Sequence, residues 1–257
     1  GANSSFVNQI VDEAVPADET VESVKALVYG DSGAGKTTFL GSGKDNGKND
    51  LIIAIEHGTV SAARSGSKAK ILRPKNWDEL VEIVEEVVND PKRFDWVCVD
   101  SLTQLQDMIW KHILDSATSA NPHRSPFKRE LQEYGEAQER YKMIVNRLLD
   151  SEANVIFTAL TETTVDEEGN SVKMPSIHGK QGALAMWTAA KPDIVCYLSV
   201  ARTQKGQVYR RYQFNKTPEV YAKDRFSVFD RPVANLTLAE FTDKLLNADS
   251  DGEKTDS

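Results

Sequence analysis

Short apolar runs rich in β-branched residues recur along the chain, and polar segments separate them. They cover residues 24–29, 51–55, 96–99, 154–160 and 193–200. Two segments between the runs, 78–88 (with Asn76 as its cap) and 130–150, place apolar residues at the three- and four-residue intervals of a helix. Continuous apolar strands that alternate with helices indicate a mostly parallel sheet flanked by helices. We therefore predict an α/β fold.

The pattern changes after residue 200. Residues 207–214 alternate and follow Lys205-Gly206, which predicts the second arm of an antiparallel hairpin with residues 194–202. A last apolar periodicity from Leu236 to Leu246 predicts a helix with Thr237 as its cap. The parallel sheet should therefore carry an antiparallel C-terminal extension.

Both ends of the chain differ from this central block. Residues 1–22 are polar and acidic, which predicts a flexible N-terminal arm with room for a short helix. The exception is one apolar cluster: Phe6, Val7, Ile10 and Val11. This cluster either docks on a neighbouring subunit or packs on its own core. Residues 248–257 predict a disordered acidic tail, which leaves a single domain over residues 23–247.

Composition and charge narrow the class of protein. The chain has 257 residues, of which 40% are hydrophobic, enough for one substantial core. Its net charge of −8 excludes a strongly basic nucleic-acid-binding surface over the whole molecule, but not a local one. Cys98 and Cys196 lie in apolar runs, as small buried side chains of a reducing compartment do. No apolar run reaches the roughly 18 residues of a membrane span and no signal peptide opens the chain, so we expect a soluble, cytoplasmic protein.

Residues 30–37 carry the most specific motif. They read Gly-Asp-Ser-Gly-Ala-Gly-Lys-Thr, the GxxxxGK[ST] pattern of a phosphate loop, between a predicted strand and a helix that opens at Thr37. In this context backbone N–H groups surround phosphates, while glycines allow their close approach. Lys36 should reach the β- and γ-phosphates, and the Thr37 hydroxyl should bind Mg²⁺. The residues expected to bind a nucleoside triphosphate are Gly30, Asp31, Ser32, Gly33, Ala34, Gly35, Lys36, Thr37 and Thr38.

Two of the apolar strands end in a carboxylate. Residues 96–99 lead into Asp100, the Walker B arrangement, in which an acid at the carboxyl end of a parallel strand faces the phosphate loop and can hold Mg²⁺. Residues 51–55 lead into Glu56, which either polarises the water that attacks the γ-phosphate or is a solvated strand end. The residues by themselves leave both interpretations of Glu56 open.

The order of these motifs resembles the RecA-type ATPase core over about residues 22–230. More narrowly, the chain is similar to phage-encoded RecA-like nucleotide-binding proteins linked to recombination and single-strand annealing. Two shorter, less specific segments also look like features of that group: residues 174–180 and 222–226. The resemblance implies an ATP- and Mg²⁺-dependent ATPase that acts on single-stranded DNA. It makes Glu56 the catalytic base and Asp100 the acid associated with Mg²⁺.

The resemblance also implies a polar sensor and a residue supplied in trans. RecA-like proteins often place Gln after the strand that follows Walker B, whereas this chain has Thr161 and Glu162 there, with Thr158 as the other candidate. Active sites of the family lie between subunits, where a Lys or Arg of the neighbour reaches the γ-phosphate. Self-association into a ring or filament is therefore expected. The candidates for the catalytic residue in trans are Lys216, Lys223 and Arg225.

Residues 117–129 and 161–186 form two polar segments, and the second is predicted to contain a hairpin that turns at residues 168–170. By position they resemble the two DNA-facing loops of RecA-like proteins. Basic and aromatic side chains there could contact a single-stranded backbone and stack on bases, although the acids at 166–168 oppose this. The candidate nucleic-acid contacts are Arg124, Phe127, Lys128, Arg129, Lys173, His178 and Lys180.

Other P-loop classes fit less well. Residues 215–218 lack the Asp that would read guanine, which argues against a GTPase, and we find neither an LSGGQ-like signature of transporter ATPases nor the Arg-rich lid of small-molecule kinases. A replicative helicase or helicase loader shares the same core and stays open. So does a non-enzymatic module whose assembly is switched by ATP. In the leading interpretation, the acidic tail recruits a single-strand-binding or replication protein.

Overall fold

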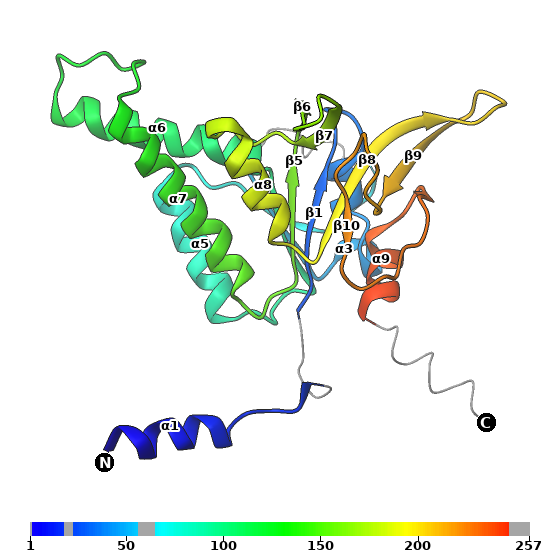
Figure 1. The fold of residues 1–257 in the computed structure, drawn as a ribbon, viewed down its shortest axis with the longest axis horizontal. Coiled ribbons are helices and arrows are strands. Elements are labelled where there is room, and N and C mark those ends of the chain that lie inside the picture. The colour runs from blue at the N-terminus through cyan, green and yellow to red at the C-terminus, as the bar shows by residue number, and fades with distance from the viewer. Residues whose placement is uncertain (1, 18–22, 56–64, 247–257) are drawn as a thin grey trace.

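A nine-stranded sheet organises the part of the chain that the computed structural model describes, residues 2–17, 23–55 and 65–246 (Figure 1). Across the sheet, the strands are β3 (Lys70–Leu72), β2 (Asp50–Ala54), β4 (Trp96–Asp100), β5 (Val155–Ala159), β1 (Lys25–Tyr29), β8 (Ile194–Arg202), β9 (Val208–Gln213) and β11 (Val233–Ala234), with β10 (Lys223–Asp224) paired to β8. The first six are parallel, whereas β9, β10 and β11 are antiparallel to their neighbours. The predicted fold class, including its antiparallel extension, is confirmed.

The five predicted apolar runs all form strands of this sheet. Strands β1, β2, β4 and β5 are buried along their whole length, because both faces of the sheet are covered. Cys98 of β4 and Cys196 of β8 are free and buried, as expected. Strand β3 was not predicted, since it has only three residues at the edge of the sheet, two of them exposed.

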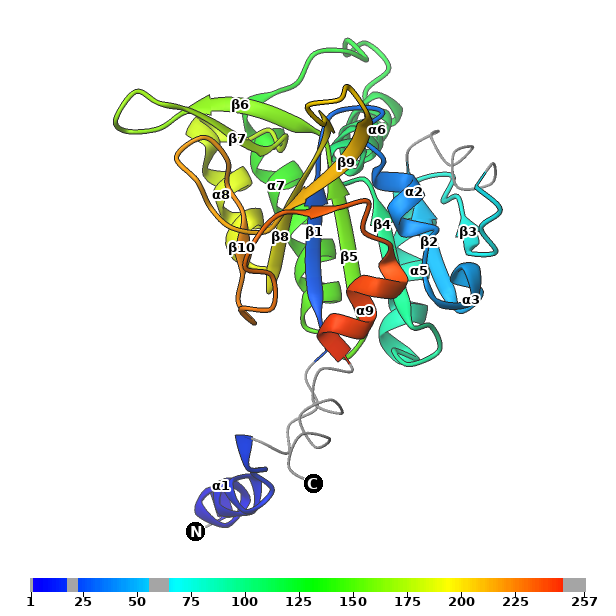
Figure 2. The ribbon, with the colours of Figure 1, turned by 90° about the vertical axis from the view of Figure 1, so that its right-hand side faces the viewer.

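Helices cover the two faces of the sheet (Figures 1 and 2). One face carries α5 (Trp77–Asn89), α6 (Leu102–Ala120), α7 (Leu131–Leu149) and α8 (Ala183–Ala190), and the other carries α2 (Lys36–Leu40) and α9 (Leu238–Leu246), with the short α3 (Lys44–Gly47) after α2. Both predicted caps are present. The Asn76 side chain accepts a hydrogen bond from the Glu79 N–H at 2.9 Å, and the Thr237 hydroxyl accepts one from the Glu240 N–H at 3.1 Å.

Helix α1 (Ala2–Asp12) forms within the predicted N-terminal arm and lies away from the sheet in both views (Figures 1 and 2). The side chains of Phe6, Val7, Ile10 and Val11 are all more than half exposed. The structure therefore does not pack this apolar cluster on the core of the same chain.

The two polar segments are shorter as loops than expected. Helix α6 continues to Ala120 and so takes up the start of the first segment. In the second, β6 (Thr161–Val165) and β7 (Ser171–Pro175) form the predicted hairpin, and η2 (Lys180–Gly182) leads into α8. Polar composition alone did not reveal the last part of α6 or the short helix η2, because helix ends tolerate polar side chains.

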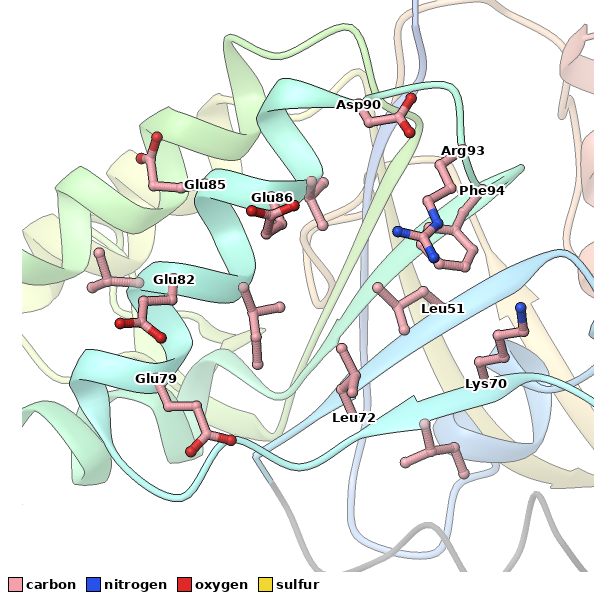
Figure 3. A pocket seen from close by; sticks show the side chains of 14 residues that line it. Leu51, Lys70, Leu72, Glu79, Glu82, Glu85, Glu86, Asp90, Arg93 and Phe94 are labelled. Atoms are coloured by element: carbon pink, nitrogen blue, oxygen red, sulfur yellow. The ribbon is translucent and has the colours of Figure 1, made fainter.

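An open groove of about 710 Å³ lies between α5 and the β3 edge of the sheet (Figure 3). Leu51, Leu72 and Phe94 line its apolar side. Acidic side chains follow the α5 side: Glu79, Glu82, Glu85, Glu86 and Asp90. Because this wall is so acidic, the groove is a poor site for a triphosphate, whose phosphates carry several negative charges.

Candidate nucleotide-binding site

Residues 30–37 join the end of β1 to the start of α2 at the carboxyl edge of the parallel strands. Gly33 and Gly35 have φ angles of +80° and +108°, in the left-handed region that favours glycine. At Gly30 a Cβ would lie 2.3 Å from the Leu198 carbonyl oxygen of β8, so no larger residue fits without displacing that strand. The loop shape therefore requires three glycines of the motif, each for a local reason.

Lys36 begins helix α2 and is almost fully buried. Its Nζ donates hydrogen bonds to the Gly30 carbonyl at 2.7 Å and to the Asp31 carbonyl at 2.9 Å. The ammonium group thus lies over the loop whose N–H groups are expected to bind phosphates. Of the other predicted loop residues, Ala34 is buried, whereas Asp31, Ser32, Gly33 and Thr38 are exposed.

Asp100 ends β4 and is fully buried beside the loop. Its Oδ2 accepts a hydrogen bond from the Thr37 hydroxyl at 2.9 Å, and its Oδ1 accepts one from the Thr158 hydroxyl of β5 at 2.6 Å. The three side chains come from α2 and two adjacent strands, so the strand order of the sheet brings them together. They are three of the residues that the sequence singled out.

The oxygen donors of this cluster suit Mg²⁺, which prefers carboxylates, hydroxyls, phosphates and water. Thr37 and Asp100 are the residues that would hold the ion, as the sequence suggested. Among the described residues, no group of three or more His, Cys, Asp or Glu side chains is arranged to hold a metal. A magnesium ion here would therefore take most of its ligands from phosphate oxygens and water, as is usual for Mg²⁺ bound with a nucleotide.

The two candidate sensors differ in their contacts. Thr158 is bound to Asp100, as described above. The Thr161 hydroxyl, at the start of β6, is buried and has no hydrogen-bond partner in the described part of the chain. Thr158 is therefore already part of the Asp100 cluster, while the hydroxyl of Thr161 remains able to bond a further group.

Arg210 of β9 contacts the loop, and sequence reasoning missed it. Its Nη1 donates a hydrogen bond to the Gly33 carbonyl at 2.7 Å, and its side chain lies 3.5 Å from where a Cβ on Gly35 would be. Two residues further on, Tyr212 packs against Phe39 of α2, so this face of β9 lies over the loop and its helix. The alternation of residues 207–214 indicated the two faces of this strand, but not that its partner strand β8 would lie next to β1.

Glu56 and His57 lie outside the residues that the structure describes. The strand that precedes them is described: β2 ends at Ala54, and the Ile55 N–H donates to the Asp100 carbonyl at 2.7 Å. The backbone at Ile55, the residue just before Glu56, therefore lies beside the end of β4. Whether Glu56 serves as the base stays a prediction.

Two of the three candidates for a residue in trans, Lys223 and Arg225, lie at the end of the sheet opposite the phosphate loop of their own chain. The Arg225 guanidinium pairs with Asp193 at 3.1 Å, and Asp193 also accepts from the Lys25 N–H, at the amino ends of β1 and β8. The Lys223 ammonium donates to the Ala190 carbonyl, and burial lowers its pKa. Lys216 is exposed after β9. Any role of Lys223 or Arg225 at the γ-phosphate would therefore have to be in a neighbouring copy.

The candidate nucleic-acid contacts differ in how freely their side chains are presented. The Arg124 guanidinium bonds to buried Glu133, a contact that lowers the pKa of that carboxyl, and to the Lys128 carbonyl. These bonds favour a structural role for Arg124. On β7, Lys173 donates to the Thr163 hydroxyl, whereas Phe127 is 86% exposed.

The two predicted DNA-facing segments meet at one cavity of about 670 Å³ between α6, α7 and the 178–184 segment. Arg129 comes from the first segment, and His178 and Lys180 come from the second. The Arg129 guanidinium lies 4.1 Å from the centre of the Trp110 ring, and Tyr134 packs edge-on against the same ring. No acidic side chain lines this cavity, in contrast to the groove beside α5.

A glycine-shaped loop between a strand and a helix, a lysine over that loop and an acid bonded to its threonine define a P-loop nucleotide-binding fold. A family model described as an AAA domain matches residues 22–226. Because the match covers well over half of the chain, the protein belongs to this AAA domain family of P-loop ATPases.

Two solved structures resemble the chain only distantly. The X-ray structure of the Legionella pneumophila ATPase DotB has 11% identity and a TM-score of 0.33, with 77% of this chain and 48% of that chain covered. The uncharacterized protein PH0321 from Pyrococcus horikoshii, in complex with an unknown peptide, has 9% identity and a TM-score of 0.39, with 82% and 90% covered. The chain thus spans about half the length of the DotB chain. Similarities of this size carry no argument about function.

No curated protein matches the sequence. Among the described helices, none has both the length and the apolar composition needed to cross a membrane.

Proposed function

We propose that the protein binds ATP with Mg²⁺ and hydrolyses it. The observation that carries this proposal is the buried Asp100 carboxylate, which bonds to Thr37 of the phosphate loop and to Thr158 of the next strand. A buried carboxylate held by two hydroxyls has a fixed orientation, and fixed polar groups need no reorganisation when charge develops in a reaction.

The residues of this site have separate roles in binding and hydrolysing ATP. Lys36 neutralises phosphate charge at the loop, and Thr37 and Asp100 would hold Mg²⁺, which supplies further charge neutralisation. Glu56 orients and deprotonates the attacking water, a role that rests on the RecA-like resemblance and not on described geometry. A lysine or arginine from a neighbouring copy, Lys216, Lys223 or Arg225, completes the site.

We further propose that the protein acts on single-stranded DNA, in recombination, annealing or replication. The cavity between α6 and α7 supports this proposal, because it combines Arg129 and Lys180 with the aromatic rings of Trp110 and Tyr134. Cationic and aromatic side chains together bind backbone phosphates and stack on bases. The chain has a net charge of −8, but no acidic side chain lines this cavity. The cavity is therefore a local basic surface of the kind that the composition left possible.

Two other functions share the same nucleotide site. A helicase or helicase loader would use ATP on a strand that passes through a ring, and an assembly module would use ATP binding, without essential hydrolysis, to switch self-association. Both need the nucleotide. Only the module keeps its biological activity when turnover is lost but binding survives.

Charge reversal in the cavity tests the DNA proposal. A fluorescently labelled oligonucleotide is titrated with protein and ATP at low salt, and its anisotropy is followed. Wild type should bind, and Arg129→Glu with Lys180→Glu should weaken binding by about tenfold or more, since two phosphate contacts become repulsive. The matched control, Lys48→Glu with Lys75→Glu, changes two exposed lysines outside the cavity by the same charge. Equal weakening by both pairs, or no binding by wild type, would contradict the proposal.

A further inference from the structure

Arg210 connects the antiparallel extension of the sheet to the phosphate loop. Its guanidinium donates to the Gly33 carbonyl at 2.7 Å and passes beside Gly35, the residue before Lys36. Gly33 and Gly35 are the two loop residues held at positive φ. The contact is thus made at the part of the loop whose backbone conformation is least restricted in a free chain.

Asn235 fixes the backbone of Arg210 from the other side. The Arg210 N–H donates to the Asn235 side-chain oxygen at 2.9 Å, and the Asn235 N–H donates to the Arg210 carbonyl at 2.8 Å. Asn235 follows β11 with a φ of +52°, a conformation that asparagine and glycine tolerate better than other residues. Hydrogen bonds therefore run without a break from Asn235 through Arg210 to Gly33.

The neighbouring residue Arg211 has a different environment. Side chains alternate between the two faces of a strand, so Arg211 points away from the loop, and its Nη1 lies 3.3 Å from the Gln213 side-chain oxygen. The chain thus offers two adjacent arginines on one strand, of which one contacts the loop.

We propose that Arg210 is a positioning residue for the triphosphate, and that Asn235 acts through it. By holding the Gly33 carbonyl, Arg210 keeps the loop in the shape that directs its N–H groups at phosphates, so less conformational freedom is lost on binding. Its positive charge also offsets the cost of bringing phosphates close to Asp31 and Asp100. The inference rests on the proposed ATP function.

Because the contact acts on a loop that binds phosphates in both the ground state and the transition state, its loss should appear mainly as weaker binding. Removal of interactions shared by the two states raises KM and leaves kcat nearly unchanged. A variant that merely destabilised the fold would lower the active fraction and hence kcat. The split between KM and kcat therefore separates a positioning role from a structural one.

The experiment measures the Kd for MgATP by calorimetry, and KM and kcat by phosphate release. Arg210→Ala should weaken binding by about tenfold, and Arg210→Lys, which keeps the charge but not the planar fork, by less. Asn235→Gly, which keeps the left-handed backbone and removes the side-chain oxygen, should weaken it by about threefold and add nothing to Arg210→Ala. Arg211→Ala is the matched control and should bind within about twofold of wild type.

Wild-type affinity in Arg210→Ala, equal losses in Arg210→Ala and Arg211→Ala, or additive effects of Arg210→Ala and Asn235→Gly would overturn the inference while leaving the ATP function intact. Absence of MgATP binding by wild type would instead remove the proposed function, and this inference with it. Should Arg210→Ala fail to fold, Arg210→Gln keeps the methylene stem but is too short to bring a donor to the position of Nη1, and the same outcomes apply to it.

Discussion

At the scale of single residues, the site depends on how Asp100 is held. A buried carboxylate needs hydrogen-bond donors, and here hydroxyls from Thr37 and Thr158 supply them. Donors of this kind orient a metal-binding acid, and their removal commonly costs ten- to a hundredfold in affinity or activity, by an order-of-magnitude rule.

Thr158→Val removes one of these donors with little change of shape. We expect the kcat/KM of ATP hydrolysis to fall by about tenfold, because Asp100 loses the group that fixes its Oδ1. Thr161→Val is the matched substitution at the other sensor candidate, whose hydroxyl bonds to none of the described residues. A loss of turnover in Thr161→Val and not in Thr158→Val would show that this assignment of the two threonines is wrong.

At the scale of elements, the pairing of strands explains the position of the nucleotide site and also the burial of Asp50, which lies at the other end of the sheet. Asp50 starts β2 opposite Trp96 of β4, is almost fully buried, and accepts a hydrogen bond from the Trp96 N–H at 3.1 Å. Burial, and secondarily the charge of Asp95, raises the pKa of Asp50 to about 7, although the Trp96 hydrogen bond opposes this. The close strand pairing and the adjacent Gly43 leave little room for water around this carboxyl.

The raised pKa of Asp50 predicts a pH dependence of stability. In the unfolded chain an aspartate titrates near 4, so between pH 4 and 7 the unfolded state loses a proton that the folded state keeps. The free energy of unfolding should therefore fall as pH rises through this window, by at most about 4 kcal/mol from this group. Asp50→Asn removes the titration, so the variant should gain stability relative to wild type between pH 5 and pH 8 in urea unfolding. A constant difference between the two proteins would contradict this.

The elements also show which features of the structure could be predicted from the sequence and which could not. Buried strands were predictable because each is a continuous apolar run, and Lys36, Thr37 and Asp100 were predictable because the phosphate loop and the acid at a strand end have fixed places in the fold. Arg210 was not, since its contact depends on which strands lie next to each other. The bond between Arg124 and Glu133 was missed for a similar reason: a charge in a polar segment looks free until its partner is placed.

At the scale of the whole molecule, the features of the proposed ATPase lie on different parts of the sheet and its helices. The phosphate loop lies at the carboxyl edge of the parallel strands, the basic aromatic cavity lies between α6 and α7, and Lys223 and Arg225 lie toward the amino end of β8. Residues at opposite edges of a sheet can share a site when copies stack head to tail. We propose that the protein forms a repeated assembly in which each copy completes the site of the next.

The measurement that tests the central claim most directly is calorimetric titration of the protein with ATP at saturating Mg²⁺, for wild type and Lys36→Ala. We expect saturable binding to wild type and a loss of at least about tenfold in affinity in the variant, because the ammonium group that lies over the loop is removed. Absence of binding heat with wild type, or equal affinity in the two proteins, would contradict the account.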